Sequence, residues 1–228
     1  MLLSLDWDYC SGSREHVFDA PLWGTPDREH DREARWRERA RNRDAQAAGW
    51  EALDKDFLLY DDGEALLAYL GVPTFVAWSH AHAWSWLERF PGREVHNFDS
   101  HHDLFSLSGE KARLRPGNWA GLALRQQLVS RYRCVYPCWH QEVRVAEGYD
   151  LARTRREIEA VLSDEIVARI EFVRGVDWPP PPQVESLLLV QSPSWTSPAH
   201  DGRFLDLARA LHAMPLSEPY LRPYTKLS

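Results

Sequence analysis

The chain has 228 residues, enough for one α/β domain with a full core, and its 44% hydrophobic and 27% charged residues are typical of globular proteins. The formal net charge of −7 argues against a nucleic-acid partner, and no apolar run approaches the roughly 18 residues of a membrane-spanning helix. Three cysteines without zinc-finger spacing, and an amino terminus without the basic start of a signal peptide, predict a reduced, cytoplasmic protein.

The chain begins with a strand, expected over Met1–Asp8, and then carries a charged insertion over residues 27–50. Within this insertion both charge signs recur at helical spacing over Asp27–Asp44, which is typical of a solvated helix stabilised by side-chain pairs. A docking arm for a partner or for a peptide substrate is the alternative interpretation.

The rest of the chain alternates between apolar strands and helices. Strands are expected over Pro73–Trp78, Arg93–His96, Arg131–Tyr136, Ile166–Val173 and Ser186–Val190, and helices over Glu64–Leu70, 83–90, Pro116–Ser130, Asp150–Leu162 and Gly202–Met214. Apolar strands separated by helices predict a parallel sheet covered on both faces. We therefore expect one α/β domain over residues 1–228, a three-layer αβα fold with a mainly parallel sheet, in which ligands bind at the carboxyl ends of the strands.

Acids and histidines follow these strands at the point where each one ends. Asp99, His101 and Asp103 are two residues apart from one another, so an extended backbone would direct all three to one side. Asp6 and Asp8 have the same spacing after the first strand. The sequence thus predicts that two acidic strand ends, distant along the chain, converge in space. His102 is expected on the opposite face, in a packing or supporting role.

Four carboxylates gathered with histidines repel one another unless a cation lies among them. The predicted ligand set contains oxygens, a few imidazoles and no thiolate, which favours Mn²⁺ or a similar hard ion over a structural zinc. Six side chains suffice for two ions about 3.5–4 Å apart, bridged by carboxylates. These predicted metal ligands are Asp6, Asp8, His80, Asp99, His101 and Asp103.

These motifs resemble those of the arginase, agmatinase and deacetylase superfamily. Residues 99–103 are similar to its Asp-x-His-x-Asp signature, residues 6–8 to its Asp-x-Asp signature, and His80 to its remaining histidine ligand. The amino-terminal LDWDY, the central FDSHHDL, the GNW at 117–119 and the SPSWT at 192–196 are similar to the branch that contains peptide arginases and many uncharacterised relatives. The resemblance covers about residues 2–198.

The resemblance implies a role for each predicted ligand. Asp6 and Asp99 would bridge the two ions and act in catalysis; His80 and Asp103 would complete one ion, and His101 and Asp8 the other. The implied reaction is hydrolysis of arginine side chains in a ribosomally made precursor peptide to ornithine and urea, with two Mn²⁺ ions as cofactors. The alternatives are a zinc-dependent deacetylase or amidohydrolase on the same fold and a non-catalytic metal-binding scaffold. Oligomer formation stays open.

Other predicted site residues depend on the same resemblance. The family's Gly-Asn-x-His-Gly stretch is similar to residues 117–121, where Ala120 replaces the histidine that carries a proton. His82 is therefore predicted as the catalytic proton carrier, with His140 as its alternative. The predicted substrate-binding residues are Asn118, Trp119, Trp195 and Glu142. For the carboxylate that anchors the guanidinium group, Glu142, Asp177 and Asp201 are the three candidates.

Overall fold

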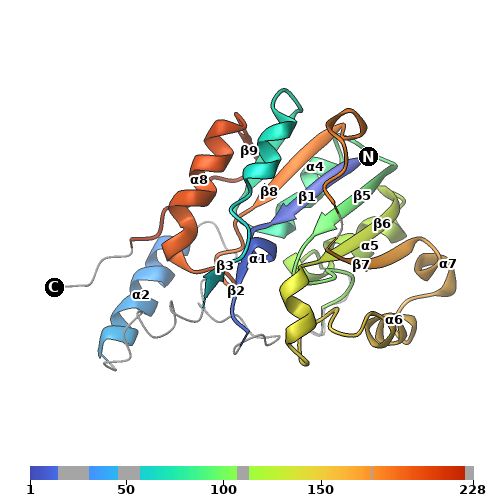
Figure 1. Ribbon diagram of the computed structural model, residues 1–228, viewed down its shortest axis with the longest axis horizontal. Coiled ribbons are helices and arrows are strands. Elements are labelled where there is room, and N and C mark those ends of the chain that lie inside the picture. The colour runs from blue at the N-terminus through green and yellow to red at the C-terminus, as the bar shows by residue number, and fades with distance from the viewer. Residues whose placement is uncertain (15–30, 46–56, 107–112, 176, 224–228) are drawn as a thin grey trace.

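The computed structural model describes residues 1–14, 31–45, 57–106, 113–175 and 177–223, and its central feature is a seven-stranded sheet (Figure 1). The strand order is β7-β6-β5-β1-β8-β4-β9, and every pairing in this sheet is parallel. The strands are β1 (Leu2–Asp6), β4 (Thr74–Ala77), β5 (Arg93–Phe98), β6 (Val129–Tyr136), β7 (Ile170–Arg174), β8 (Ser186–Val190) and β9 (Met214–Pro215). Two short strands, β2 (Ser11–Gly12) and β3 (Leu58–Leu59), pair separately in an antiparallel ribbon. The predicted α/β class with a parallel sheet is confirmed.

Short helices connect the strands. The α-helices are α1 (Trp7–Cys10), α2 (Arg32–Ala45), α4 (Ala83–Leu87), α5 (Trp119–Arg125), α6 (Leu151–Glu159), α7 (Asp164–Val167) and α8 (Asp201–Ala210). Short 3₁₀ helices are η1 (Glu64–Tyr69), η2 (His80–His82), η3 (Pro116–Asn118), η4 (Cys138–Glu142), η5 (Pro181–Gln183) and η6 (Pro198–His200). No helix in the described part of the chain combines the length and the hydrophobicity that a membrane span requires.

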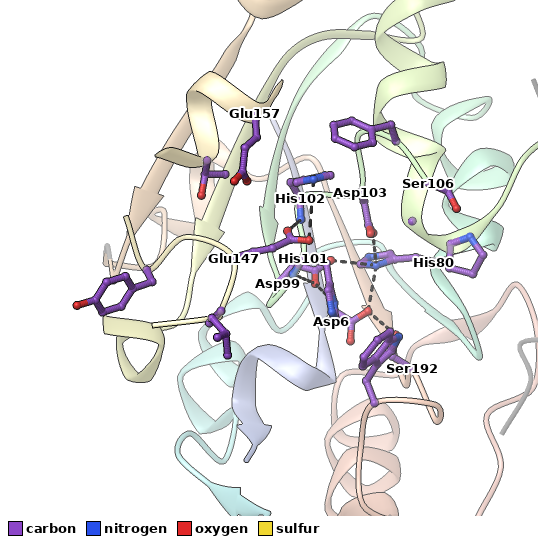
Figure 2. Close-up of a pocket in the computed structure, with 18 of the residues that line it drawn as sticks. Asp6, His80, Asp99, His101, His102, Asp103, Ser106, Glu147, Glu157 and Ser192 are labelled. Atoms are coloured by element: carbon purple, nitrogen blue, oxygen red, sulfur yellow. Dashed lines mark hydrogen bonds and ion pairs between the residues drawn. The ribbon is translucent and has the colours of Figure 1, made fainter. Parts of the chain in front are cut away.

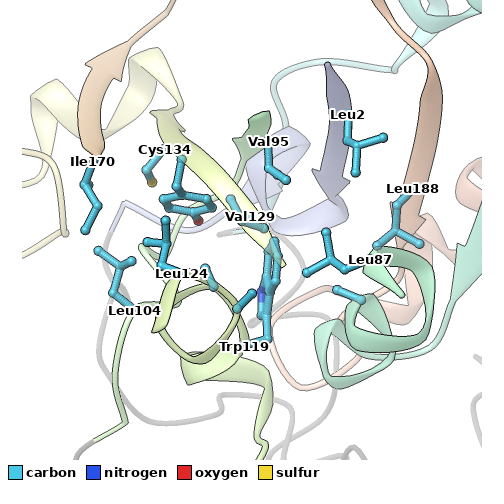
Figure 3. Close-up of a cluster of buried hydrophobic side chains, with 14 of the residues drawn as sticks. Leu2, Leu87, Val95, Leu104, Trp119, Leu124, Val129, Cys134, Ile170 and Leu188 are labelled. Atoms are coloured by element: carbon cyan, nitrogen blue, oxygen red, sulfur yellow. The ribbon is translucent and has the colours of Figure 1, made fainter. Parts of the chain in front are cut away.

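Two large hydrophobic clusters form the core, one on each face of the sheet, and a smaller described cluster contains Trp139, Val143 and Ala146. Alternate residues of a strand enter different clusters, so Leu188 of β8 packs on one face while Leu187 and Leu189 pack on the other. The first cluster joins the sheet to α4, α5, α6 and α7 (Figure 3), and the second joins it to α1, η1 and α8. Burial on both faces is the reason that β8 is apolar throughout, and it gives the three-layer αβα arrangement.

Several predicted boundaries are wrong: the last helix, for example, ends at Ala210 rather than Met214. The helix expected to continue to Ser130 ends at Arg125, because the chain reverses at Gln127, which has a φ of 60°, and β6 begins at Val129. The strand expected from Ile166 begins only at Ile170, because residues 164–167 form α7 after Ser163, and these short apolar stretches are ambiguous between helix and strand.

The charged insertion contains a solvated helix, as predicted, over the residues that the structure describes. Arg35 pairs with Asp31 and Glu38, while the side chain of Trp36 is buried. Residues 27–30 and 46–50 of the predicted insertion lie outside the described residues. The helix attaches to the remainder of the protein through Trp36 and through Arg32, which donates to the carbonyl of Glu218 and lies over the ring of Trp78.

The parallel topology places the carboxyl ends of β1, β5, β8 and β4 along one edge of the sheet. β1 lies between β5 and β8, and β4 lies on the far side of β8. The segments that follow Asp6, Phe98, Ala77 and Val190 therefore meet although they are far apart in sequence. This is the edge at which open parallel sheets bind ligands.

Candidate metal centre

Asp6 and Asp8 reach this edge by a different route from the one predicted. β1 ends at Asp6, whose Oδ1 accepts a hydrogen bond from the amide of Asp8 at 3.0 Å and so caps the short helix α1. Asp8 therefore projects from a helical turn rather than from an extended strand. Its Oδ1 accepts a hydrogen bond from the amide of Ser100 at 3.1 Å, which connects the end of β1 to the end of β5.

Asp99 lies at the middle of the buried acidic cluster, immediately after β5. Its Oδ2 is 3.2 Å from Nδ1 of His80, and its Oδ1 is 3.6 Å from Nδ1 of His101. One carboxylate thus faces two imidazoles with its two oxygens, as a bridging ligand does. The chain bends after Phe98, so the alternation predicted for Asp99, His101 and Asp103 does not describe their geometry.

His80 enters the cluster from the turn that follows β4. Its Nδ1 is 3.0 Å from Asp6 Oδ2 and 3.0 Å from Asp103 Oδ2, in addition to Asp99, while its Nε2 is 3.0 Å from the hydroxyl of Ser4. A proton on Nε2 that is donated to Ser4 leaves the Nδ1 lone pair facing three carboxylates. That arrangement is stable only with a cation between these atoms, either a proton on His80 or a metal ion.

The pKa shifts within the described cluster also indicate that a cation is needed there. Burial, followed by the charges of Asp6 and Asp99, raises the pKa of Asp8. Burial and the charge of Asp99 raise the pKa of Asp103 to about 7. Burial disfavours the charged form of Asp99, but hydrogen bonds from His101 and His80 outweigh it and lower its pKa. For His80, hydrogen bonds to Asp103, Asp6 and Asp99 overcome burial and raise its pKa. Without a metal ion, protons on these groups must offset the negative charge of the cluster.

Two groups of side chains have ligand atoms close enough to hold a metal ion. The first is Asp6, His80 and Asp99, and the second is Asp8, Asp99 and His101, with the ligand atoms of each group within 4.8 Å of one another. Asp99 belongs to both groups. The donor set of carboxylate oxygens and imidazole nitrogens without thiolate fits Mn²⁺ or another divalent ion of similar hardness. Asp103 supports the first group through its contact with His80.

A cavity of about 710 Å³ opens above the cluster (Figure 2). Its floor contains Asp6, His80, Asp99, His101 and Asp103. The remaining wall includes aromatic side chains, several arginines and three further carboxylates: Phe105, Tyr149, Trp195, Arg115, Arg144, Arg153, Glu147, Asp150 and Glu157. A volume of this size accommodates a whole small-molecule ligand or a short stretch of peptide.

The backbone is strained at two positions of the site. Asp103 has a φ of 52° and Ser192 a φ of 45°, a left-handed conformation that non-glycine residues adopt rarely. Ser192 donates a hydrogen bond to Oδ2 of Asp6. Asp103 accepts a hydrogen bond from Nε1 of Trp119 at 2.7 Å. The strain therefore accompanies side chains that hold the acidic cluster in place.

Two of the predicted substrate-binding residues lie at the site. Trp195 lines the cavity, with its ring centroid 4.5 Å from that of His101. Trp119 is buried behind the cluster, where it donates a hydrogen bond to Asp103 and packs against His80 with the two ring centroids 5.2 Å apart. Trp119 consequently supports the candidate metal ligands from below the cavity and is not among the side chains that line it.

The other predicted residues lie away from the cavity wall. His82, predicted to carry a proton, directs its Nδ1 to the carbonyl of Ser79 at 3.2 Å. Asn118 is engaged locally: its Oδ1 accepts from the amide of Arg115, and its Nδ2 donates to a nearby carbonyl. Glu142 pairs with Arg14 at 2.7 Å on the surface. Local hydrogen bonds and surface pairing occupy these three side chains.

The alternatives for the proton carrier and the anchoring carboxylate also lie elsewhere. His140 is fully buried, and burial lowers its pKa to about 4 although Nδ1 contacts the carbonyl of Glu147 at 2.7 Å. Asp201 is fully buried in an ion pair with Arg222 at 2.6 Å. Asp177 is exposed and is not among the residues that line the cavity.

Sequence reasoning missed several residues at the site. Glu147 lines the cavity beside His102, whose amide donates to Oε2 of Glu147 at 2.8 Å (Figure 2). His102 itself also lines the cavity, contrary to the expectation that it faces away. Asn97 donates to Asp99 Oδ2 at 2.9 Å and so orients it. His102 and Asn97 are adjacent to the motif in sequence, and this adjacency could have identified them. Glu147 follows η4, far from the motif, and no sequence signal indicated it.

Comparisons of the chain with protein-family models, with curated proteins and with solved structures found no match. The geometry of the cluster and of the cavity therefore carries the functional argument.

Proposed function

We propose that this chain is a metal-dependent hydrolase that cleaves a carbon–nitrogen bond, and that its substrate is an arginine side chain of a precursor peptide, which becomes ornithine as urea is released. The observation that carries the proposal is the sharing of Asp99 between two metal-ligand groups on the floor of an open cavity. A shared carboxylate is typical of two-metal hydrolytic sites.

The proposed cofactor is a pair of Mn²⁺ ions, one held by Asp6, His80 and Asp99 and the other by Asp8, Asp99 and His101. Such ions supply Lewis acidity and bring the pKa of water from about 15.7 towards neutrality. The oxygen-rich ligand set favours manganese over zinc.

Neighbouring side chains fix the orientation of the proposed ligands. Asn97 donates to Asp99, Ser192 donates to Asp6, and the hydroxyl of Ser4 contacts Nε2 of His80. The contact of Ser4 leaves Nδ1 of His80 directed into the cluster, whereas Asn97 and Ser192 donate to the carboxylate oxygens that themselves face His80. Hydrogen bonds of this kind set the tautomer of a histidine ligand and the basicity of a carboxylate ligand.

Glu147 is the proposed anchor for the guanidinium group. It lines the cavity, it is partly buried, and its charge contributes to the raised pKa of His101, so it lies within electrostatic reach of the cluster. A carboxylate binds a planar guanidinium through two parallel hydrogen bonds, which it cannot do with an ammonium group. Trp195, packed against His101, supplies a flat apolar part of the wall of the same cavity.

His102 is the proposed proton carrier to the departing amine. Its Nδ1 accepts a hydrogen bond from the amide of Leu104 at 3.0 Å, which places the proton of the neutral ring on Nε2. That Nε2 is 3.9 Å from Oε1 of Glu147. A general acid of this type contributes about 10²–10⁴-fold to a rate.

The test is incubation of the purified chain with Mn²⁺ and arginine-containing peptides, followed by mass spectrometry and a urea assay. Conversion should give equal amounts of ornithine and urea, and Asp99→Asn should abolish both. His102→Gln should lower kcat while peptide binding is retained. One zinc ion per chain together with release of acetate from acetylated peptides would instead support a deacetylase. Peptide binding without turnover across these substrates would leave only a metal-binding scaffold.

A further inference from the structure

The wall of the cavity carries both charge signs. Among its carboxylates, Glu147 accepts from the amide of His102, Asp150 caps α6, and Glu157 pairs with an arginine. The floor is acidic, while Arg115, Arg144 and Arg153 approach from three separate segments of the chain. Arg153 is neutralised by Glu157, whose Oε1 lies 2.9 Å from its Nε. Arg144 is exposed and has no ion pair or hydrogen bond with any residue that the structure describes. The cavity wall thus carries a positive charge that no described residue pairs with.

Arg144 belongs to a segment that presents both charge and apolar surface at the cavity. Val145 and Tyr149, which also line the cavity, are 67% and 37% exposed. Cavities of about 300–1,000 Å³ surround most of a drug-sized ligand, so a volume of about 710 Å³ exceeds what one extended side chain fills. The space beyond the acidic floor is therefore available to residues that neighbour the one bound there.

We infer that this segment selects peptides that carry an acidic side chain beside the residue bound on the cavity floor, and that Arg144 binds that acid. That the peptide residue bound on the cavity floor is an arginine rests on the proposed function. The preference for a neighbouring acidic residue rests on the positive charge of Arg144 on the cavity wall. Arg115 adds a second positive charge to the same cavity.

The charge of Arg144 can distinguish between peptides, which a general attraction of the cavity for cations cannot do. With metal ions on the floor, the carboxylate of Glu147 attracts a cationic side chain, and it does so equally in peptides with several consecutive basic residues. Arg144 repels a second cation at the mouth and attracts a carboxylate, so it distinguishes acidic from basic neighbours. Because Arg144 is exposed, its pairing with a carboxylate is worth a factor of about two to five in affinity, and reversal of its charge should invert the preference.

The experiment measures dissociation constants by isothermal titration calorimetry for the full chain with Mn²⁺. Three peptides share one central arginine flanked by glutamate, by glutamine or by lysine. The wild type should bind the glutamate peptide about fivefold more tightly than the lysine peptide. Arg144→Glu should reverse that order. Arg131→Glu makes the same charge change at the start of β6, at the opposite edge of the sheet, and should leave the order unchanged.

The outcomes separate this inference from the proposed function. Arg144-dependent selection without formation of urea would support the inference and remove the arginase assignment. Formation of urea with equal affinity for the three peptides would overturn the inference and leave the function in place. Equal affinities without urea, or a loss of selectivity in Arg131→Glu as large as that in Arg144→Glu, would also overturn it.

Discussion

Substitution of Arg222 by alanine is expected to destabilise the protein more than any other change to a single arginine of the described carboxyl-terminal segment. The side chain is fully buried, and its guanidinium group donates to both carboxylate oxygens of Asp201 at 2.7 and 2.6 Å. It also donates to the carbonyls of Pro193 at 2.6 Å and Thr196 at 2.9 Å, and it lies over the ring of Trp36 at 5.2 Å.

Among the described residues, Arg222→Ala would leave the buried carboxylate of Asp201 with two weaker partners, the side chain of Gln191 and the amide of residue 222. Removal of one member of a buried ion pair costs about 3–5 kcal/mol, because the remaining charge is not compensated. Asp201→Asn in the same background removes that charge and should recover about 1–3 kcal/mol of the loss. The free energy of unfolding from urea denaturation measures both effects.

The matched control is Arg209→Ala. Arg209 pairs with Asp206 at 2.8 Å, but its side chain is 73% exposed, so its removal should change stability by less than about 0.5 kcal/mol. Because Arg222 holds the segment that contains Ser192 and Trp195, Mn²⁺ affinity should also fall in Arg222→Ala. A loss of stability below about 1 kcal/mol, or equal losses in the two alanine variants, would refute the reasoning.

Three further predictions test the site and its support. Asp8→Asn retains an oxygen for the amide of Ser100 and removes a buried charge, so the stability of the metal-free protein should rise by roughly 1 kcal/mol. The increase in Tm on adding Mn²⁺ should become smaller, because a candidate ligand is lost. Thermal unfolding with and without Mn²⁺ measures both effects. Gly121→Ala would place its Cβ 1.9 Å from a backbone oxygen and should cost at least about 1–3 kcal/mol in urea denaturation, whereas Gly202→Ala meets no atom within 4 Å and should stabilise α8 by about 0.5–1 kcal/mol. Equal effects of the two glycine substitutions would contradict the close packing of α5. In EDTA, lowering the pH from 6.5 to 4 should reduce the free energy of unfolding of the wild type by up to about 3 kcal/mol more than that of His140→Gln. The reason is that His140 takes up its proton at a higher pH in the unfolded chain than in the folded protein. Parallel plots of unfolding free energy against pH for the two proteins would exclude this.

The site shows where sequence reasoning succeeded and where it failed. The spacing of Asp99, His101 and Asp103 predicted a cluster, and the cluster is present. The backbone of these residues, however, is not extended as the prediction assumed. The chain bends after β5, and Asp8 projects from α1, because Asp6 ends its strand as a helix cap. A period-two pattern on four or five residues cannot distinguish a strand from the turn that follows it.

The sequence by itself determined the fold class and the chemistry available at the sheet edge. Runs such as Leu187–Val190 are apolar at every position, which requires burial on both faces of a sheet, and ligand-type side chains follow such runs at the carboxyl ends. These features are local, since each depends on residues adjacent in the chain.

Only the tertiary structure decided which side chains share the cavity. Glu147 reaches His102 across 45 residues, and the hydroxyl of Ser192 reaches Asp6 across 186. Those contacts depend on the order β5-β1-β8-β4 in the sheet and on the loops that leave it. Strand order is set by the packing of the whole core, so no local spacing in the sequence encodes it.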